Sequence, residues 1–361
     1  MAGRANVTPS VATATLRSPH ADIVAAATAF VDSYLDALRA LSPEEVGRTP
    51  CFGYGRGGVA YTLLKAGTLR GDRTLVRAAK RWAAAGLRSG RTFHLRGWPK
   101  HSFGRGLTGL HAIAALAAHA EGDVAACRRE LRRFVESSRR ARGRLDLLQG
   151  LAGRLAGAAV VMRRIPDPGV RALGDELAER ILAALAARAV RLRPRGLAHG
   201  WAGVALAALS WQAAVGTLPR RGLCSAVLAA RREGSIPKWT DWAHGDAGMA
   251  LLFARAYVQL GDRRFLAWAR EAAARAHAER RRGFSVIDGA PGVAYCMLAV
   301  AAADPEGPWR DAAWEIAGRI FSYIDVPDFF PYGAWSGLGG ICCLALDLIH
   351  ETEAGFPGVE A

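Results

Sequence analysis

The sequence predicts an all-α protein, an α/α toroid (double-layered barrel) of seven helix-pair repeats. Three observations indicate this fold. A Gly-x-x-Gly pattern recurs along the whole chain, an apolar run follows each occurrence, and amphipathic segments lie between the runs. The chain has 361 residues, of which 51% are hydrophobic and 22% charged, a composition that excludes a mainly disordered protein.

Gly-x-x-Gly followed by a small or apolar helix-forming run occurs seven times, and successive first glycines are 44 to 51 residues apart. A single occurrence would carry no information, whereas seven at nearly even spacing indicate a repeat architecture. The seven occurrences lie at residues 55–58, 106–109, 150–153, 200–203, 245–248, 289–292 and 337–340.

The runs that follow the glycine pairs are predicted to be buried inner helices. Examples are LHAIAALAAHA, VALAALSWQAA, MALLFARAYVQLG and VAYCMLAVAAA, which are apolar on most faces. The stretch 196–219 carries no charge and is long enough to span a membrane. Its place in the repeat favours a buried inner helix instead.

The segments between these runs are predicted to be outer helices with one solvated face. Asp72, Asp123 and Asp262 are expected to lie at their N-termini, and Gly71 and Gly261 at the ends of preceding helices. The amphipathic segments are 74–87, 124–136, 170–187, 263–281 and 309–323.

Seven inner helices surrounded by outer helices would close into a ring and leave no open ends to cap. The Gly-x-x-Gly turns would then gather at one rim of a central cavity. The inner helices would point their N-terminal dipoles and free N–H groups toward that rim, an arrangement that favours anions.

The predicted domain organisation is a flexible N-terminal tail at residues 1–19 and a single toroid domain at residues 20–361. The six cysteines form no C-x-x-C pair, and no basic and then apolar signal segment opens the chain. A cytoplasmic protein without a disulfide framework is therefore expected.

The net charge of +16 would favour anionic partners through long-range attraction. The arginines are scattered, however, often as pairs within helical segments, for example Arg128 and Arg129. Solvated helix faces explain this pattern better than a nucleic-acid or membrane surface, and no nucleic-acid motif is present.

The residues directly before each first glycine are the candidates for chemistry, because the turns would line the cavity. They are Tyr54, Arg105, Gln149, His199, His244, Asp288 and Ser336. Asp146 lies four residues before Gly150. Aromatic residues lie beside these candidates at Trp201, Trp239, Trp242 and Trp335.

The segments DLLQGLAG, GLAHGWAG, WAHGDAG and IDGAPG, in this order and spacing, resemble the lanthionine synthetase cyclase (LanC-like) family. The resemblance extends from about Cys51 to about His350. It implies a double-layered α-toroid that adds a peptide cysteine thiol to dehydroalanine or dehydrobutyrine and so forms a thioether ring.

The same resemblance implies a branch of the family without zinc and without another cofactor. Family members bind zinc through a Cys two residues before the first glycine of the fifth Gly-x-x-Gly pair. A Cys-His pair directly before the first glycine of the sixth pair supplies the other two ligands. Those positions are Ala243, Ile287 and Asp288 here, and an aliphatic side chain cannot be a ligand. The family's arginine would fall near Trp239, where Lys238 is adjacent but not aligned.

The family's aspartate and histidine correspond to Asp146 and His199. Our hypothesis is that His199 is the acid/base, that Asp146 orients or charges it, and that His244 is a second proton-transfer group. Arg105 and the helix N-termini would stabilise the enolate. Substrate contacts are expected from Arg105, Asp288, Trp201, Trp239, Trp242, Trp335 and Lys238.

Each candidate also has a structural interpretation. His199 could be a hydrogen-bonded core histidine, Asp146 a helix cap, and the tryptophans part of the core. His244 and Asp288 could be structural, and with His199 they form a set that could hold a different metal.

Three functions remain open at the level of the sequence. The first is a zinc-independent cyclase acting on a dehydrated precursor peptide, with a separate kinase and lyase as pathway partners. The second is a catalytically silent relative that binds a peptide or scaffolds those enzymes. The third is a carbohydrate enzyme that would need two carboxylates from Asp146, Asp241, Asp246 and Asp288.

Overall fold

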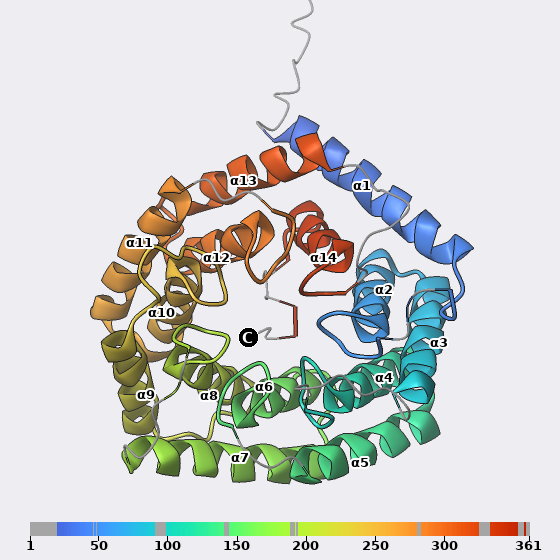
Figure 1. Cartoon of the computed structure of the whole chain (residues 1–361), viewed down its shortest axis with the longest axis horizontal. Helices are drawn as coiled ribbons and strands as arrows, with labels where there is room; N and C mark the ends of the chain where they lie inside the picture. The colour runs from blue at the N-terminus through green and yellow to red at the C-terminus, as the bar shows by residue number, and fades with distance from the viewer. Residues whose placement is uncertain are drawn as a thin grey trace, which may run out of the picture.

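The structure is a computed structural model. It describes residues 20–45, 47, 49–90, 99–140, 144–187, 192, 194–279, 283–324, 333–352 and 357–358. The tail expected at residues 1–19 lies outside these residues. Among them, fourteen α-helices form two concentric layers, which confirms the predicted toroid (Figure 1).

The inner layer consists of the helices that follow the glycine pairs. They are α2 (Arg56–Arg70), α4 (Leu107–Glu121), α6 (Leu151–Met162), α8 (Trp201–Val215), α10 (Asp246–Leu260), α12 (Ala290–Ala303) and α14 (Leu338–Ile349). These helices are buried on nearly every side. In α8, each residue from Trp201 to Trp211 is buried, which confirms that the uncharged stretch forms an inner helix.

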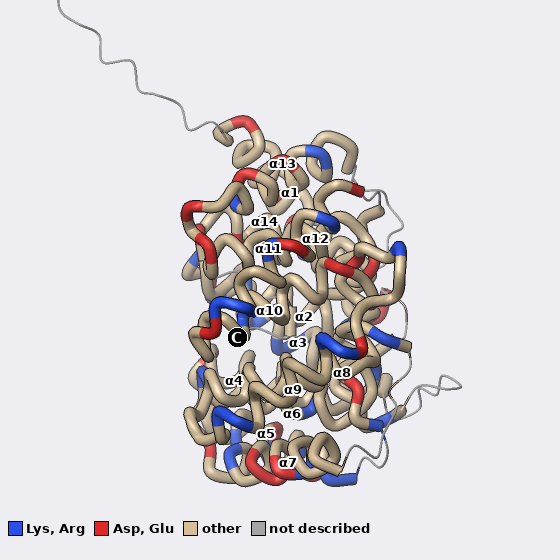
Figure 2. The backbone as a smooth tube through the Cα atoms, turned by 90° about the vertical axis from the view of Figure 1, so that its left-hand side faces the viewer, with Lys and Arg blue, Asp and Glu red and all other residues tan. Residues whose placement is uncertain are grey.

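The outer layer consists of α1 (Ala21–Ala40), α3 (Arg73–Ser89), α5 (Val124–Arg140), α7 (Pro168–Ala186), α9 (Arg220–Glu233), α11 (Arg263–Ala278) and α13 (Trp309–Tyr323). The charged residues of these helices lie over the outside of the molecule (Figure 2). No helix in the described part of the chain combines the length and apolar character needed to cross a membrane.

The ring closes through the two ends of the chain. The last inner helix, α14, packs against the first, α2, and the N-terminal helix α1 covers α13 and α14 from outside (Figure 1). Helix α1 is therefore the outer partner of α14, as α3 is of α2.

The predicted helix ends are confirmed where the sequence marked them. Asp72 accepts hydrogen bonds from the N–H groups of Thr74 and Leu75, and Asp262 accepts one from Arg264. Asp123 accepts one from the N–H of Ala126. Helices α2 and α10 end at left-handed glycines, Gly71 and Gly261.

The second glycine of every pair is required by a close backbone approach. A Cβ added at any of the seven would lie no more than 2.6 Å from the carbonyl oxygen six residues earlier, for example Phe52 for Gly58. Real Cβ atoms do not come so near, so only glycine lets the preceding loop fold back over the helix start.

The first N–H of the inner helices is satisfied in a repeated way. In five repeats it donates to the carbonyl oxygen seven residues earlier, as Leu107 does to Lys100 and Asp246 to Trp239. In the fourth repeat, the N–H of Trp201 donates instead to the Glu233 carboxylate at the end of α9, at 2.7 Å.

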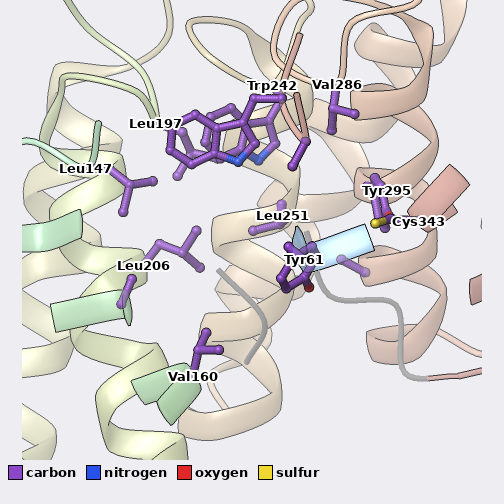
Figure 3. Close-up of a cluster of buried hydrophobic side chains, with 14 of the residues drawn as sticks. Tyr61, Leu147, Val160, Leu197, Leu206, Trp242, Leu251, Val286, Tyr295 and Cys343 are labelled. Atoms are coloured by element: carbon purple, nitrogen blue, oxygen red, sulfur yellow. The ribbon is translucent and has the colours of Figure 1, made fainter. Parts of the chain in front are cut away.

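The residues three before the first glycines point into the middle of the ring. Leu147, Leu197, Trp242 and Val286 converge there, above Leu251 and Tyr295 from the inner helices (Figure 3). All six are buried. Because side chains fill this level of the ring, candidate chemistry is left to the mouth above it.

Candidate functional site at the mouth of the ring

Main-chain hydrogen bonds join neighbouring rim loops. In six of the seven repeats, the residue two positions before the first glycine donates its N–H to the carbonyl oxygen of the equivalent residue in the next repeat. The six such bonds among the described residues are Gly53 to Gly104, Leu148 to Ala198, Ala198 to Ala243, Ala243 to Ile287, Ile287 to Trp335, and Trp335 to Gly53. Their N···O distances are 2.8 to 3.3 Å. The rim is thus a nearly continuous ring of backbone.

The residues directly before the first glycines are the accessible positions of this rim. Tyr54, Arg105, Gln149, His199, His244 and Ser336 are half-buried and Asp288 is exposed. The residues one and two positions before them are buried in every repeat. The structure therefore brings the equivalent polar positions to one mouth.

His199 and Asp146 come together from adjacent loops. His199 Nδ1 lies 3.5 Å from Asp146 Oδ1, and the Asp146 side chain is almost fully buried. The same carboxylate accepts the N–H of Gln149 at 2.7 Å, which fixes its own loop. Nδ1 of His199 is buried and has no hydrogen-bond partner within the described residues, so the Asp146 carboxylate is its nearest ionic neighbour.

His244 lies next to His199, with 6.1 Å between the ring centroids. Its Nδ1 is 3.9 Å from Asp241 Oδ1, and Asp241 accepts the His244 N–H at 2.7 Å. Burial lowers the pKa of His244, and the neighbouring His199 lowers it further, while Asp241 and Asp288 oppose the shift. His244 is therefore a neutral imidazole at pH 7, the form that accepts a proton.

Trp239 adjoins His244, and Lys238 precedes Trp239 in the chain. The Trp239 ring meets the His244 ring edge to face at 5.2 Å and is 43% exposed. Lys238 is exposed and has a positive φ of 67°. An accessible aromatic face thus stands beside the imidazole pair, and the residue before it in the chain is an exposed lysine.

Arg105 lies elsewhere on the rim, against Tyr54. Its guanidinium carbon is 5.5 Å from the centre of the Tyr54 ring, and its Nη2 donates to the Tyr54 hydroxyl at 3.4 Å. The described contacts place Arg105 with the first two repeats and not with the imidazoles of repeats four and five.

The other three tryptophans are not at the mouth. Trp242 and Trp335 are core residues, with 0% and 1% of their surface exposed. Trp201, the first residue of α8, lines a groove of about 890 Å³ between α7 and α9, beside Leu182 and Leu228. Trp242 and Trp335 lie three and two residues before a first glycine, where the loop side chains are buried, so they offer no surface to a peptide at the mouth in this conformation.

The positions that hold zinc in the resembling family do not fit a metal here. Ala243 and Ile287 are buried aliphatic residues and Asp288 is exposed. Within the described residues, no three His, Cys, Asp or Glu side chains stand close enough to hold a metal ion. This result also applies to the set His199, His244 and Asp288.

Two of the contacts that hold the rim were not predicted from the sequence. Asp241 accepts the main-chain N–H of His244, as Asp146 accepts that of Gln149. The sequence signal for this contact is that both aspartates lie four residues before the first glycine of their repeat. Glu233 reaches the start of α8 from the end of α9, and no local sequence pattern marks it.

Two of the carboxylates that a carbohydrate enzyme would need are already occupied by the fold. Asp241 is fully buried, and Asp246 pairs with Arg275 at 2.9 Å.

Comparisons with known proteins agree with this architecture. A family profile described as "Lanthionine synthetase C-like protein" matches residues 53–361. Among solved structures, one titled "Nisin cyclase" superposes with a TM-score of 0.67 at 14% sequence identity. The match covers 92% of this chain and 95% of that one. At this identity the likeness shows a shared toroid fold.

Proposed function

We propose, since the chain belongs to the lanthionine synthetase C-like family, that it is a lanthipeptide cyclase that works without zinc. Its substrate would be a precursor peptide that contains cysteine and dehydroalanine or dehydrobutyrine. The thiol sulfur adds to the β-carbon of the dehydro residue and forms the C–S bond of a thioether ring.

The reaction moves one proton from the thiol to the α-carbon. A free cysteine thiol has a pKa of about 8.5, so without a metal a base must take this proton. We assign that step to the neutral imidazole of His244. His199, with Nδ1 toward Asp146, donates a proton through Nε2 to the α-carbon as the carbon–carbon double bond is consumed. The proton that His244 took from the thiol then passes to His199, so both imidazoles return to their starting state.

The observation that carries this proposal is the pairing of two rim imidazoles on adjacent repeats, 6.1 Å apart, with Nδ1 atoms 3.5 and 3.9 Å from buried carboxylate oxygens. Trp239 supplies an exposed aromatic face at the same place for a peptide, and the exposed Lys238 precedes it in the chain. The net charge of +16 would attract a precursor with an acidic leader.

The test is cyclisation of a dehydrated cysteine peptide, followed by alkylation of remaining thiols and mass spectrometry. His199→Ala is expected to slow ring formation by about 10²–10⁴-fold, the usual contribution of a general acid or base. Gln149→Ala is the matched control, because Gln149 holds the equivalent rim position one repeat earlier. Cyclisation by His199→Ala at the wild-type rate would contradict the assignment.

Zinc independence is tested in the same assay. Activity is expected to survive dialysis against a strong chelator, and no zinc should be found by elemental analysis of the active protein. Loss of activity that returns on adding zinc would refute this part of the proposal.

A silent scaffold is the second candidate, favoured by the aliphatic residues Ala243 and Ile287 at the family's metal positions. A protein that binds the dehydrated peptide and leaves its thiol free would be such a scaffold. In either case we infer a pathway with a separate kinase and lyase, working in the cytoplasm, where the six unpaired cysteines would stay reduced.

A further inference from the structure

Side chains from the rim loops of repeats seven, one and two form a buried aromatic cluster. The Trp335 indole lies over two glycines, Gly53 and Gly104, where any side chain would collide with it. Phe52 meets Trp335 edge to face at 5.3 Å, and Phe103 packs against Phe52 at 5.6 Å. We call Phe52, Phe103 and Trp335 the aromatic cup.

Two residues from the end of the chain occupy this cup. The Trp335 indole N–H donates a hydrogen bond of 3.0 Å to the carbonyl oxygen of Pro357. A Cβ added at Gly358 would lie 2.7 Å from Phe52 Cε1 and 3.1 Å from Phe103 Cε1. Both residues are buried.

The chemistry of these contacts is that of peptide recognition. The indole N–H binds a main-chain carbonyl, which every peptide offers, and the two phenyl rings leave room only for a residue without a side chain. Gly358 has a φ of +77°, which a glycine adopts without strain. The cup therefore selects a backbone turn with glycine at its centre.

The cup is continuous with the candidate catalytic rim. Trp335 is hydrogen-bonded through its backbone to Gly53 on one side and accepts from Ile287 on the other. Ile287 in turn accepts from Ala243, the residue before His244. A peptide held in the cup would reach the imidazole pair along the same ring of loops.

We infer that the aromatic cup is a peptide-binding subsite, which Pro357 and Gly358 fill in cis and a glycine-containing segment of a separate peptide fills in trans. The identity of that peptide as the precursor rests on the proposed function, while the subsite itself does not. The chain's own end would compete with it at an effective concentration of the order of millimolar.

The test uses a chain that ends at Thr352 and a synthetic peptide of residues 353–361, EAGFPGVEA. Isothermal titration calorimetry is expected to show one peptide bound per shortened chain. The full-length chain should bind it at least about tenfold more weakly, because its own end fills the cup. A folded shortened chain that binds no peptide would overturn the inference.

Two variants show where the peptide binds. In the shortened chain, Trp335→Phe keeps a ring but loses the N–H, and affinity should fall about tenfold. Trp309→Phe is the matched control, since it loses an equivalent buried indole bond, to Asp304, far from the cup. Equal affinity of the Trp335→Phe variant and its parent would refute the assigned site.

If the shortened chain does not fold, the full-length variant Gly358→Val replaces it. The added side chain cannot fit against Phe52 and Phe103, so the end of the chain should leave the cup. The free peptide should then bind the variant more tightly than it binds the full-length wild type. No gain in affinity would overturn the inference. These binding measurements need no cyclisation, so a chain that binds the peptide and forms no ring would contradict the proposed function alone.

Discussion

At the residue scale, a side-chain oxygen four residues before the first glycine fixes several rim loops. Ser102, Asp146 and Asp241 accept the main-chain N–H groups of the residues three positions later, Arg105, Gln149 and His244. Asp146 has a second role, because it also faces the imidazole of His199. Its structural and catalytic contributions can be separated by substitution.

Asp146→Asn keeps an oxygen that can accept the Gln149 N–H, whereas Asp146→Ala removes it. We expect the unfolding temperature to change little for Asn, and stability to fall by about 1–2 kcal/mol for Ala. Cyclisation should slow in both, because neither presents a carboxylate to His199. Thermal unfolding and the alkylation assay measure the two effects. Full activity in Asp146→Asn would leave the carboxylate with a loop-fixing role only.

Glu233 makes stability depend on pH. Burial raises its pKa to about 7, although the Trp201 N–H and Arg195 oppose the shift. The folded pKa lies above the unfolded value near 4.5, so this group's contribution is complete below about pH 4.5 and is lost as the pH rises through 7. The Gln side chain of Glu233→Gln can still accept the N–H of Trp201. This variant should show a smaller change of the unfolding temperature with pH between about pH 4.5 and 8. An unchanged slope in the variant would show that other groups cause the dependence.

At the element scale, the paired glycines set where the inner helices begin. Gly203→Ala would place a Cβ against the Leu197 carbonyl oxygen and Leu147, so we expect a loss of about 1–3 kcal/mol in chemical denaturation. Gly222→Ala, in α9, is the control. Its Cβ would meet only the end of the Leu182 side chain, and alanine favours the helix. Similar stability of the two variants would contradict the close-approach explanation.

The sequence predicted the elements that carry a strong pattern. Every glycine pair opens an inner helix, and the amphipathic stretches at 74–87, 124–136 and 309–323 are outer helices. Helix α9 was not predicted, although its buried stripe, Leu223, Ala226, Val227 and Ala230, follows the helical period.

The candidate site was predictable only in part, and the reason is geometric. Equivalent repeat positions put His199 and His244 on neighbouring loops, so their proximity followed from the repeat. The direction of a loop side chain does not follow from it, and Trp242 and Trp335 therefore proved to be core residues. Contacts between distant elements, such as Glu233 with Trp201, have no local signature at all.

At the scale of the whole molecule, helix α1 completes the outer layer over the junction between the first and last repeats. Phe30 packs on Phe321 of α13 at 5.7 Å and on Tyr34 of its own helix. The stability of the ring therefore depends on a helix that precedes the first glycine pair.

Phe30→Ala should lower the free energy of unfolding by about 3–5 kcal/mol, since Phe30 is buried in this contact. Tyr323→Ala provides the control, because Tyr323 is 80% exposed at the end of α13. Urea unfolding of both variants measures the difference. A cost for Phe30→Ala as small as that for Tyr323→Ala would mean that α1 is not needed to close the ring.

The hydrogen bonds between neighbouring rim loops use main-chain atoms alone. Their geometry therefore does not depend on which side chains the accessible positions carry. One backbone can present imidazoles, carboxylates or metal ligands in turn, so relatives that share this scaffold can diverge in reaction chemistry while their architecture stays the same.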